Sequence, residues 1–215
     1  MKVYLISFLA ALVMVISACM PKYEAPEHDP GETNPTSFVM IGGTFASGYT
    51  DDALFKYGQE QSIASYIQQS LNSVNPSSFN QPYVDDGSVG LSSSGLSRLI
   101  LGYKTDCLNE TSLSPVRETA MGDANVLNNV YNGVPYNNMS IPSLRSGDFF
   151  NSDYSNQNPY FGRMSSSQTA MVDEDISAVN ATLFSVFLGL DDFMPFIKSG
   201  TRSDSLPDLN TFENN

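Results

Sequence analysis

Basic side chains are scarce in this chain of 215 residues, which has 10 lysines and arginines against 23 aspartates and glutamates. The formal charge of -13 argues against a nucleic-acid-binding role, because phosphate contacts need a basic face. It also disfavours direct adsorption to an anionic membrane surface. Tryptophan is absent, and the one histidine, His28, stands early in the chain. The rest of the sequence therefore offers no imidazole as a general base.

Long apolar runs are also lacking, apart from one near the start of the chain. Leu5 to Ile16 form an almost unbroken apolar run after Lys2, and small residues follow it up to Cys19. The run is shorter than the roughly 20 residues that a transmembrane helix needs. Its flanking charge, its length and its small-residue end are typical of a secretory signal peptide, which we assign to residues 1–18.

The segment Ile16-Ser17-Ala18-Cys19 resembles the lipobox of bacterial lipoproteins, in which the cysteine is diacylated and becomes the first residue of the mature protein. The resemblance implies a lipid anchor at Cys19 and a place at the outer membrane. Residues 19–36 are rich in proline and acid and lack an apolar period, which predicts an extended tether. The other interpretation, an ordinary signal peptide with a coincidental cysteine, predicts a free soluble protein.

The acidic stretch behind Cys19 is similar to surface-export signals of lipoproteins in the Bacteroidota. This similarity predicts a protein that faces outward on the cell surface, with a periplasm-facing position as the alternative. If Cys19 carries lipid, Cys107 is the only thiol left, and no intramolecular disulfide can form. We interpret Cys107 as an idle or buried thiol rather than as a nucleophile, because no histidine follows His28.

Residues 37–215 remain for one domain with a sizeable core, and its first pattern is a strand, a glycine turn and a helix. Phe38 to Ile41 is a short apolar run that ends at Gly42-Gly43-Thr44, which predicts a strand buried on both faces and a tight turn. Apolar residues recur four apart from Ile63 to Leu71 and predict a helix over 59–71. Ligands of open α/β sheets gather at the carboxyl ends of strands, where the threonine of this turn is expected.

Two further strands and glycine turns are predicted later in the chain. Residues 125–135 are expected to form a second central strand that ends in the turn Gly133-Val134-Pro135, with a helix beginning near residues 140–142. Residues 181–188 are the most strand-like run of the chain. This run ends at Gly189-Leu190-Asp191-Asp192, after which another helix is expected.

The remaining segments divide into one strand, one helix and polar loops. Residues 98–103 suggest a short strand, and residues 169–179 have the apolar spacing of an amphipathic helix. We interpret the acidic triplet from Asp173 to Asp175 as a solvated face of that helix rather than as a metal site, and we expect no metal and no cofactor. Turn-forming and polar residues predict loops over 72–95, 110–123 and 151–167.

The three glycine turns, in this order, resemble the blocks of the SGNH/GDSL hydrolases, especially those of lipid-anchored SGNH-like proteins from Bacteroidota. That group has a Gly-Asp-Ser-x-x-x-Gly-Tyr block, a helix with Gly-Gln, a Gly-Val-Pro turn and a Gly-x-Asn-Asp block. The matching residues here are 42–49, 58–59, 133–135 and 189–192. The resemblance covers most of the chain from Phe38 to Gly200. It implies a three-layer α/β/α fold with a mainly parallel sheet, of the SGNH hydrolase or flavodoxin-like type, incomplete at its C-terminus.

The chemistry of this family is acyl transfer, in which a serine attacks an ester carbonyl, the first three blocks hold the oxyanion and a C-terminal Asp-x-x-His supplies the base. The resemblance puts Thr44 at the nucleophile position, Gly43 at the acid before it and Gly133 at the oxyanion glycine. Asp191 replaces an asparagine that donates to the oxyanion, and an ionised carboxylate cannot donate. No Asp-x-x-His follows the Gly189 block in this sequence. We therefore expect Thr44 to be a poor nucleophile.

Three interpretations remain open. The first is a catalytically impaired surface lipoprotein with an SGNH-like domain, which acts as a scaffold or binds a small molecule or a glycan. The second is a fragment or subunit of an SGNH-type hydrolase of lipid or carbohydrate esters, whose other part supplies the catalytic histidine. The third is a structural surface lipoprotein unrelated to hydrolases. An incomplete sheet also predicts an exposed strand edge that a protein partner pairs with.

Overall fold

The computed structural model describes residues 31–200 together with residues 206 and 212. The predicted signal peptide, the lipidation site Cys19 and most of the predicted tether lie outside the described residues. No helix within the described ranges is both long enough and apolar enough to cross a membrane.

The centre of the fold is a parallel sheet of three strands in the order β4-β1-β5. The strands are β1 (Phe38–Gly42), β4 (Asn138–Ser140) and β5 (Leu183–Phe187). The middle strand β1 pairs with both neighbours, so that Met40 lies opposite Asn138 on one side and Ser185 on the other. The predicted strands at 38–41 and 181–188 are confirmed, and the architecture is mixed α/β with a parallel sheet.

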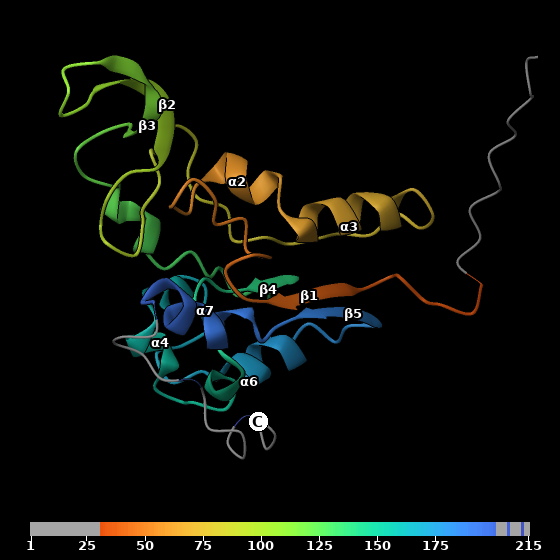
Figure 1. Ribbon diagram of the computed structural model, residues 1–215. Helices are drawn as coiled ribbons and strands as arrows, with labels where there is room; N and C mark the ends of the chain where they lie inside the picture. The colour runs from red at the N-terminus through yellow and green to blue at the C-terminus, as the bar shows by residue number, and fades with distance from the viewer. Residues whose placement is uncertain (1–30, 201–205, 207–211, 213–215) are drawn as a thin grey trace, which may run out of the picture.

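Helices lie on both sides of this sheet (Figure 1). One side carries α2 (Lys56–Glu60) and α3 (Ile63–Asn72). The other side carries α4 (Tyr154–Gln157), α6 (Val172–Ser177) and α7 (Leu190–Lys198), and α5 (Pro159–Gly162) directly follows α4. The predicted helices at 169–179 and after β5 correspond to α6 and α7.

Alternate side chains of β1 enter two separate apolar clusters, because successive residues of a strand point to opposite faces. Phe38 and Met40 form one cluster with Ala64 of α3. The apolar stripe of α3 packs against this cluster. Val39 belongs to the larger cluster, together with Ile141 and residues of the α4–α6 side. The strand is therefore covered on both faces, as its continuous apolar run predicts.

The helix predicted over 59–71 is interrupted at Gln61 and Ser62. The Ser62 side chain accepts a hydrogen bond from the Ser65 backbone N–H over 3.2 Å and so begins a new helix, α3, as its N-cap. Gln59 is buried in α2 and its side-chain amide donates to the Pro82 carbonyl oxygen over 2.7 Å. This bond ties the helix to the loop that follows α3.

The strand predicted over 125–135 is wrong, and the strand beside β1 is β4 instead. Residues Ala124–Leu127 form a 3₁₀ helix, η1, that buries Val126, and no regular element follows it up to residue 137. The side chains of Asn129 and Asn132 each accept a backbone N–H two residues on, which favours turns over a strand.

The helix predicted from residues 140–142 is also wrong. Pro142 to Arg145 form a loop in which Ser143 has a φ of 66°, and only the short 3₁₀ helix η2 (Ser146–Asp148) follows. A left-handed residue of this kind ends regular helix geometry, because a side chain in that conformation crowds the following carbonyl.

Two of the predicted polar loops contain regular structure. Residues Thr111–Arg117 form β3, which pairs antiparallel with β2 (Leu99–Thr105) in a hairpin that stands apart from the main sheet (Figure 1). The segment 151–167 contains α4 and α5, and the Asn158 side chain caps α5, with Pro159 in its first turn. The segment 72–95 has no helix beyond α3 and no named strand, as predicted.

The solvated face predicted for Asp173 to Asp175 is only partly correct. Asp175 is buried, and its carboxylate accepts hydrogen bonds from the backbone N–H and the hydroxyl of Ser166 over 3.1 and 2.5 Å. The acid therefore fixes the loop before α6 rather than facing water.

Candidate functional site

The loops after β1 and β4 meet at the carboxyl end of the sheet. The strand β1 lies between β4 and β5, so the later strands of the chain are added on opposite sides of it. The carboxyl end of β1 is therefore a topological switch point, the place where open α/β sheets bind ligands. The Ile141 N–H donates to the Gly42 carbonyl oxygen over 2.9 Å, and the Ser143 N–H donates to Thr44 Oγ1 over 2.8 Å. The two loops are thus joined directly at Thr44.

Thr44 and Asp191 form the centre of this site. The Thr44 N–H donates to Asp191 Oδ2 over 2.7 Å, and the Thr44 hydroxyl donates to Asp191 Oδ1 over 2.6 Å. Asp191 lies in the first turn of α7, directly after β5, where the helix dipole favours an acid. The structure therefore brings together two of the residues that the sequence singles out, from the ends of β1 and β5.

The next acid, Asp192, holds the loop after β4 in the same way. It is buried, and its carboxylate accepts the backbone N–H of Ser146 over 3.2 Å and the Ser146 hydroxyl over 2.8 Å. The side-chain amide of Asn158 also donates to the Pro142 carbonyl oxygen over 2.8 Å. Both acids at the start of α7 are thus bonded to loops that follow the other two strands.

The structure does not bring Gly133 to this pair. Gly133 precedes β4 in the chain, whereas Thr44 follows β1. Because β1 and β4 are parallel, the segment before β4 and the segment after β1 lie at opposite ends of the sheet. Gly133 is exposed and is not among the residues that line the pocket at Thr44. Ser143, which the sequence reasoning missed, occupies the expected place beside Thr44. Its only sequence signal is the Pro142-Ser143 turn after Ile141.

Two adjoining pockets lie at this end of the sheet, with volumes of about 490 and about 290 Å³. Both are lined by Ser93, Ser143, Arg145 and Tyr160, so they form one cleft with a shared wall. The smaller pocket also contains Thr44, Tyr49, Asp52, Asp191 and Lys198. The larger one adds a mixture of apolar, aromatic and polar residues, among them Leu91, Leu127, Asp148, Tyr154, Gln157 and Asn158.

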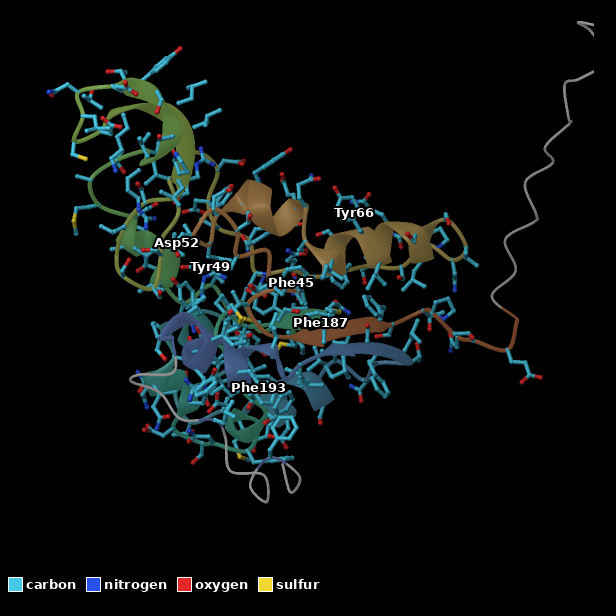
Figure 2. The ribbon with its side chains drawn as sticks, in the orientation of Figure 1. Phe45, Tyr49, Asp52, Tyr66, Phe187 and Phe193 are labelled. Carbon is cyan, nitrogen blue, oxygen red and sulfur yellow. The ribbon has the colours of Figure 1, made fainter. Side chains whose placement is uncertain are left out.

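Tyrosines form part of the cleft wall. The rings of Tyr49 and Tyr160 meet edge to face with centroids 6.0 Å apart, and the Tyr160 hydroxyl donates to the Leu91 carbonyl oxygen. Burial raises the pKa of both Tyr49 and Tyr160, so both are neutral phenols at physiological pH. Figure 2 shows Tyr49 and Asp52 next to each other below the hairpin.

The acids of the cleft are bonded to neighbours. The Arg117 guanidinium donates to Asp52 over 2.5 Å, and the Tyr49 hydroxyl donates to the same carboxylate over 3.4 Å. Burial raises the pKa of the Asp148 carboxyl, and the Arg145 backbone N–H that it accepts acts in the opposite direction. These bonds hold Asp52 and Asp148 in place at the cleft wall.

This geometry does not suit acyl transfer by Thr44. A nucleophilic hydroxyl needs a base that takes its proton, but the Thr44 hydroxyl donates to Asp191 Oδ1, and the described residues contain no histidine. A preformed oxyanion hole needs free N–H donors, but the Thr44 N–H is bonded to the same acid. Within the part of the chain that the structure describes, no group of three or more histidine, cysteine or acidic side chains is arranged to hold a metal ion.

No known protein family, curated protein or solved structure matches this chain.

Proposed function

We propose that this chain is a lipid-anchored protein of the outer membrane surface whose α/β domain binds a small polar ligand or a glycan and does not hydrolyse esters. The observation that carries the proposal is the double hydrogen bond between Thr44 and Asp191. It engages both the hydroxyl and the backbone N–H that an ester hydrolase of the SGNH type keeps available for its substrate.

We assign the fold to the SGNH hydrolase or flavodoxin-like type, with its catalytic groups replaced. Two observations support this assignment: the parallel order β4-β1-β5, and the meeting of Thr44 and Asp191 at the strand ends. In the SGNH pattern an acid stands at position 43 and an asparagine at position 191, whereas this chain has Gly43 and Asp191. Compared with that pattern, the carboxylate stands after β5 instead of after β1. The Thr44 hydroxyl donates its hydrogen bond to this carboxylate.

The cleft supports the binding part of the proposal. Its larger pocket of about 490 Å³ falls in the size range of small-molecule sites, roughly 300–1,000 Å³. The lining combines the buried rings of Tyr154 and Tyr160 with hydroxyl, amide and charged groups. Such a mixture suits a sugar ring, which offers apolar C–H faces together with hydroxyls.

The lack of hydrolysis is tested with the mature protein and p-nitrophenyl acetate and butyrate. We expect the wild type and Thr44→Ala to release nitrophenol at the same rate as each other and as buffer alone. Turnover by the wild type that disappears in Thr44→Ala would show that the hydroxyl is a working nucleophile and would contradict the proposal.

Binding is tested by saturation-transfer NMR with a panel of monosaccharides and short oligosaccharides. Ser93 is exposed and lies in the wall shared by the two pockets, so Ser93→Tyr is expected to obstruct the cleft and abolish saturation transfer. Ser78→Tyr is the matched control, because Ser78 is also exposed but lines neither pocket. Equal signals from both variants would place the ligand elsewhere and contradict a role of the cleft.

One observation favours a second candidate, a part of an SGNH-type ester hydrolase that another polypeptide segment completes. Among the described residues β5 pairs on one side only, with β1, and its Phe184 and Val186 are 67% and 52% exposed. Strands of parallel sheets are normally buried on both faces, and bare edges are usually covered. The intact mass of the protein extracted from its native membrane separates the two candidates, since a mass well above residues 19–215 with acyl chains supports the second.

A further inference from the structure

Most of the described basic side chains are already engaged. Ion pairs join Lys56 to Asp86, Arg98 to Glu118 and Arg117 to Asp52. The buried guanidinium of Arg163 donates to the carbonyl oxygens of Pro82, Tyr83 and Val126. Within the described ranges, the side chains of Lys104, Arg145 and Lys198 make neither a hydrogen bond nor an ion pair.

Two of these three unpaired cations lie in one place. Arg145, from the loop after β4, and Lys198, from the last turn of α7, both line the pocket of about 290 Å³ that contains Thr44. Arg145 lines the larger pocket as well. Lys104 lies in the hairpin strand β2, outside both pockets. In a chain with a net charge of -13, the meeting of two unpaired cations in one pocket requires an explanation.

The acids of this pocket form no ion pair with these cations. Both carboxylate oxygens of Asp191 are bonded to Thr44, and Asp52 is paired with Arg117. Asp148 accepts the backbone N–H of Arg145 and attracts its guanidinium electrostatically, but the two side chains form no ion pair. Arg145 and Lys198 thus offer charged donors in the smaller pocket, beside the hydroxyls of Ser93 and Ser143, and charged donors bind an anionic acceptor most strongly.

We propose that the ligand of the cleft carries an anionic oxygen group, a carboxylate, sulfate or phosphate, which Arg145 and Lys198 bind in the smaller pocket. The planar guanidinium of Arg145 can hold two oxygens of such a group, and the Lys198 ammonium supplies a point charge beside it. The uncharged part of the ligand lies in the larger pocket against Tyr160. This inference rests on the proposed function of the cleft as a binding site and adds the charge of its ligand.

The probes are methyl β-D-glucuronide, methyl β-D-glucoside and inorganic sulfate. The two glycosides differ only at C6, which is a carboxylate in the glucuronide and a hydroxymethyl group in the glucoside. Binding is followed through the backbone amide signals of the ¹⁵N-labelled mature protein at constant ionic strength. We expect the glucuronide to bind at least about tenfold more tightly than the glucoside, the difference that charge-assisted hydrogen bonds typically make. Sulfate is expected to compete with the glucuronide.

Substitutions test the two cations individually. Arg145→Gln and Lys198→Gln are each expected to weaken glucuronide binding about threefold to tenfold and to leave the glucoside unchanged. Lys104→Gln is the matched control, because it removes an equal charge outside the cleft, and it is expected to change neither probe. All three side chains are exposed, so the variants are expected to unfold at the wild-type temperature.

Equal affinities for the two glycosides would overturn the inference about charge, while the proposed binding function would stand. An equal loss in Lys104→Gln would also overturn it, because net charge rather than the pocket would then attract the anion. If neither sulfate nor the glucuronide shifts the signals of residues around Arg145 and Lys198, no anion site exists there. Failure of the proposed binding function gives a different result, namely equal saturation-transfer signals from Ser93→Tyr and Ser78→Tyr.

Discussion

The carboxylate of Asp191 occupies the space that a side chain on residue 43 needs. A Cβ added to Gly43 would lie 1.8 Å from Asp191 Oδ2 and 3.0 Å from its Cγ, and atoms of a folded protein do not approach so closely. Gly43 has an ordinary backbone conformation with no positive φ, so this glycine is required by its neighbour and not by its own backbone. The two positions therefore depend on each other.

We expect Gly43→Ala to lower the free energy of unfolding by about 1–3 kcal/mol, because the added methyl group displaces the Asp191 carboxylate. In the background of Asp191→Ala the same substitution is expected to cost at least about 1 kcal/mol less, because the clashing group is gone. Urea denaturation of the wild type, both single variants and the double variant gives this coupling. Strictly additive effects would contradict the contact.

Asp191→Ala by itself is expected to destabilise the domain by about 1–3 kcal/mol, because the N–H and the hydroxyl of Thr44 lose their acceptor. The lower part of this range applies if water enters the half-buried site. Asp86→Ala is the control: its side chain is 85% exposed and its pair with Lys56 is expected to contribute at most about 1 kcal/mol. A smaller effect at Asp191 than at Asp86 in urea denaturation would be evidence against the role of this bond.

Asp148 is expected to make stability depend on pH. Burial raises the pKa of its carboxyl above the ordinary value of 3.8, and hydrogen bonds from the Arg145 N–H and Tyr154 offset this only in part. Between the two pKa values the folded state binds more protons than the unfolded state, so the contribution of this group to stability is lost as pH rises through that window. Asp148→Asn, which keeps an acceptor oxygen, should therefore gain stability relative to the wild type on going from pH 4 to pH 7.

Asp153 provides a control of opposite sign. The side-chain amides of Asn156 and Gln157 lower the pKa of its carboxyl, so its stabilising contribution is present at neutral pH and is lost as pH falls. Asp153→Asn should therefore lose stability relative to the wild type on going from about pH 2.5 to pH 5, the window in which the lowered pKa acts. Urea denaturation at each pair of pH values measures the two variants, and changes of the same sign in both would contradict these assignments.

Cys19→Ser is expected to release the protein from membranes, because the thiol that would carry the lipid is gone. Fractionation of cells that produce the wild type and the variant measures this, with detection of the domain by antibody. A Cys107→Ser variant is the control and should stay in the membrane fraction, since Cys107 is an exposed cysteine in the connection between β2 and β3. Membrane retention of Cys19→Ser would count against the lipid anchor.

Continuous apolar runs in the sequence predicted the strands correctly where such runs exist. Phe38 to Ile41 and residues 181–188 correspond to β1 and β5, and Ile63, Ile67 and Leu71 form a half-buried apolar stripe of α3. These predictions succeed because burial against a sheet or a helix repeats with the local period of the backbone. Thr44 follows directly from the end of its strand, whereas Asp191 is singled out by the resemblance to the SGNH blocks.

Only the tertiary structure showed which residues stand beside them. The strand β4 has three residues, and two of them are polar, so no apolar pattern marks it. The resemblance therefore points to the Gly133 turn, whereas Ser143 is the residue beside Thr44. Arg145 and Lys198 are far apart in the sequence, and neither position has a local signal for a pocket. Local pattern thus determined the elements and the residues at their ends. The order of the strands, β4-β1-β5, determined which ends meet, because pairing between distant strands leaves no period in the sequence.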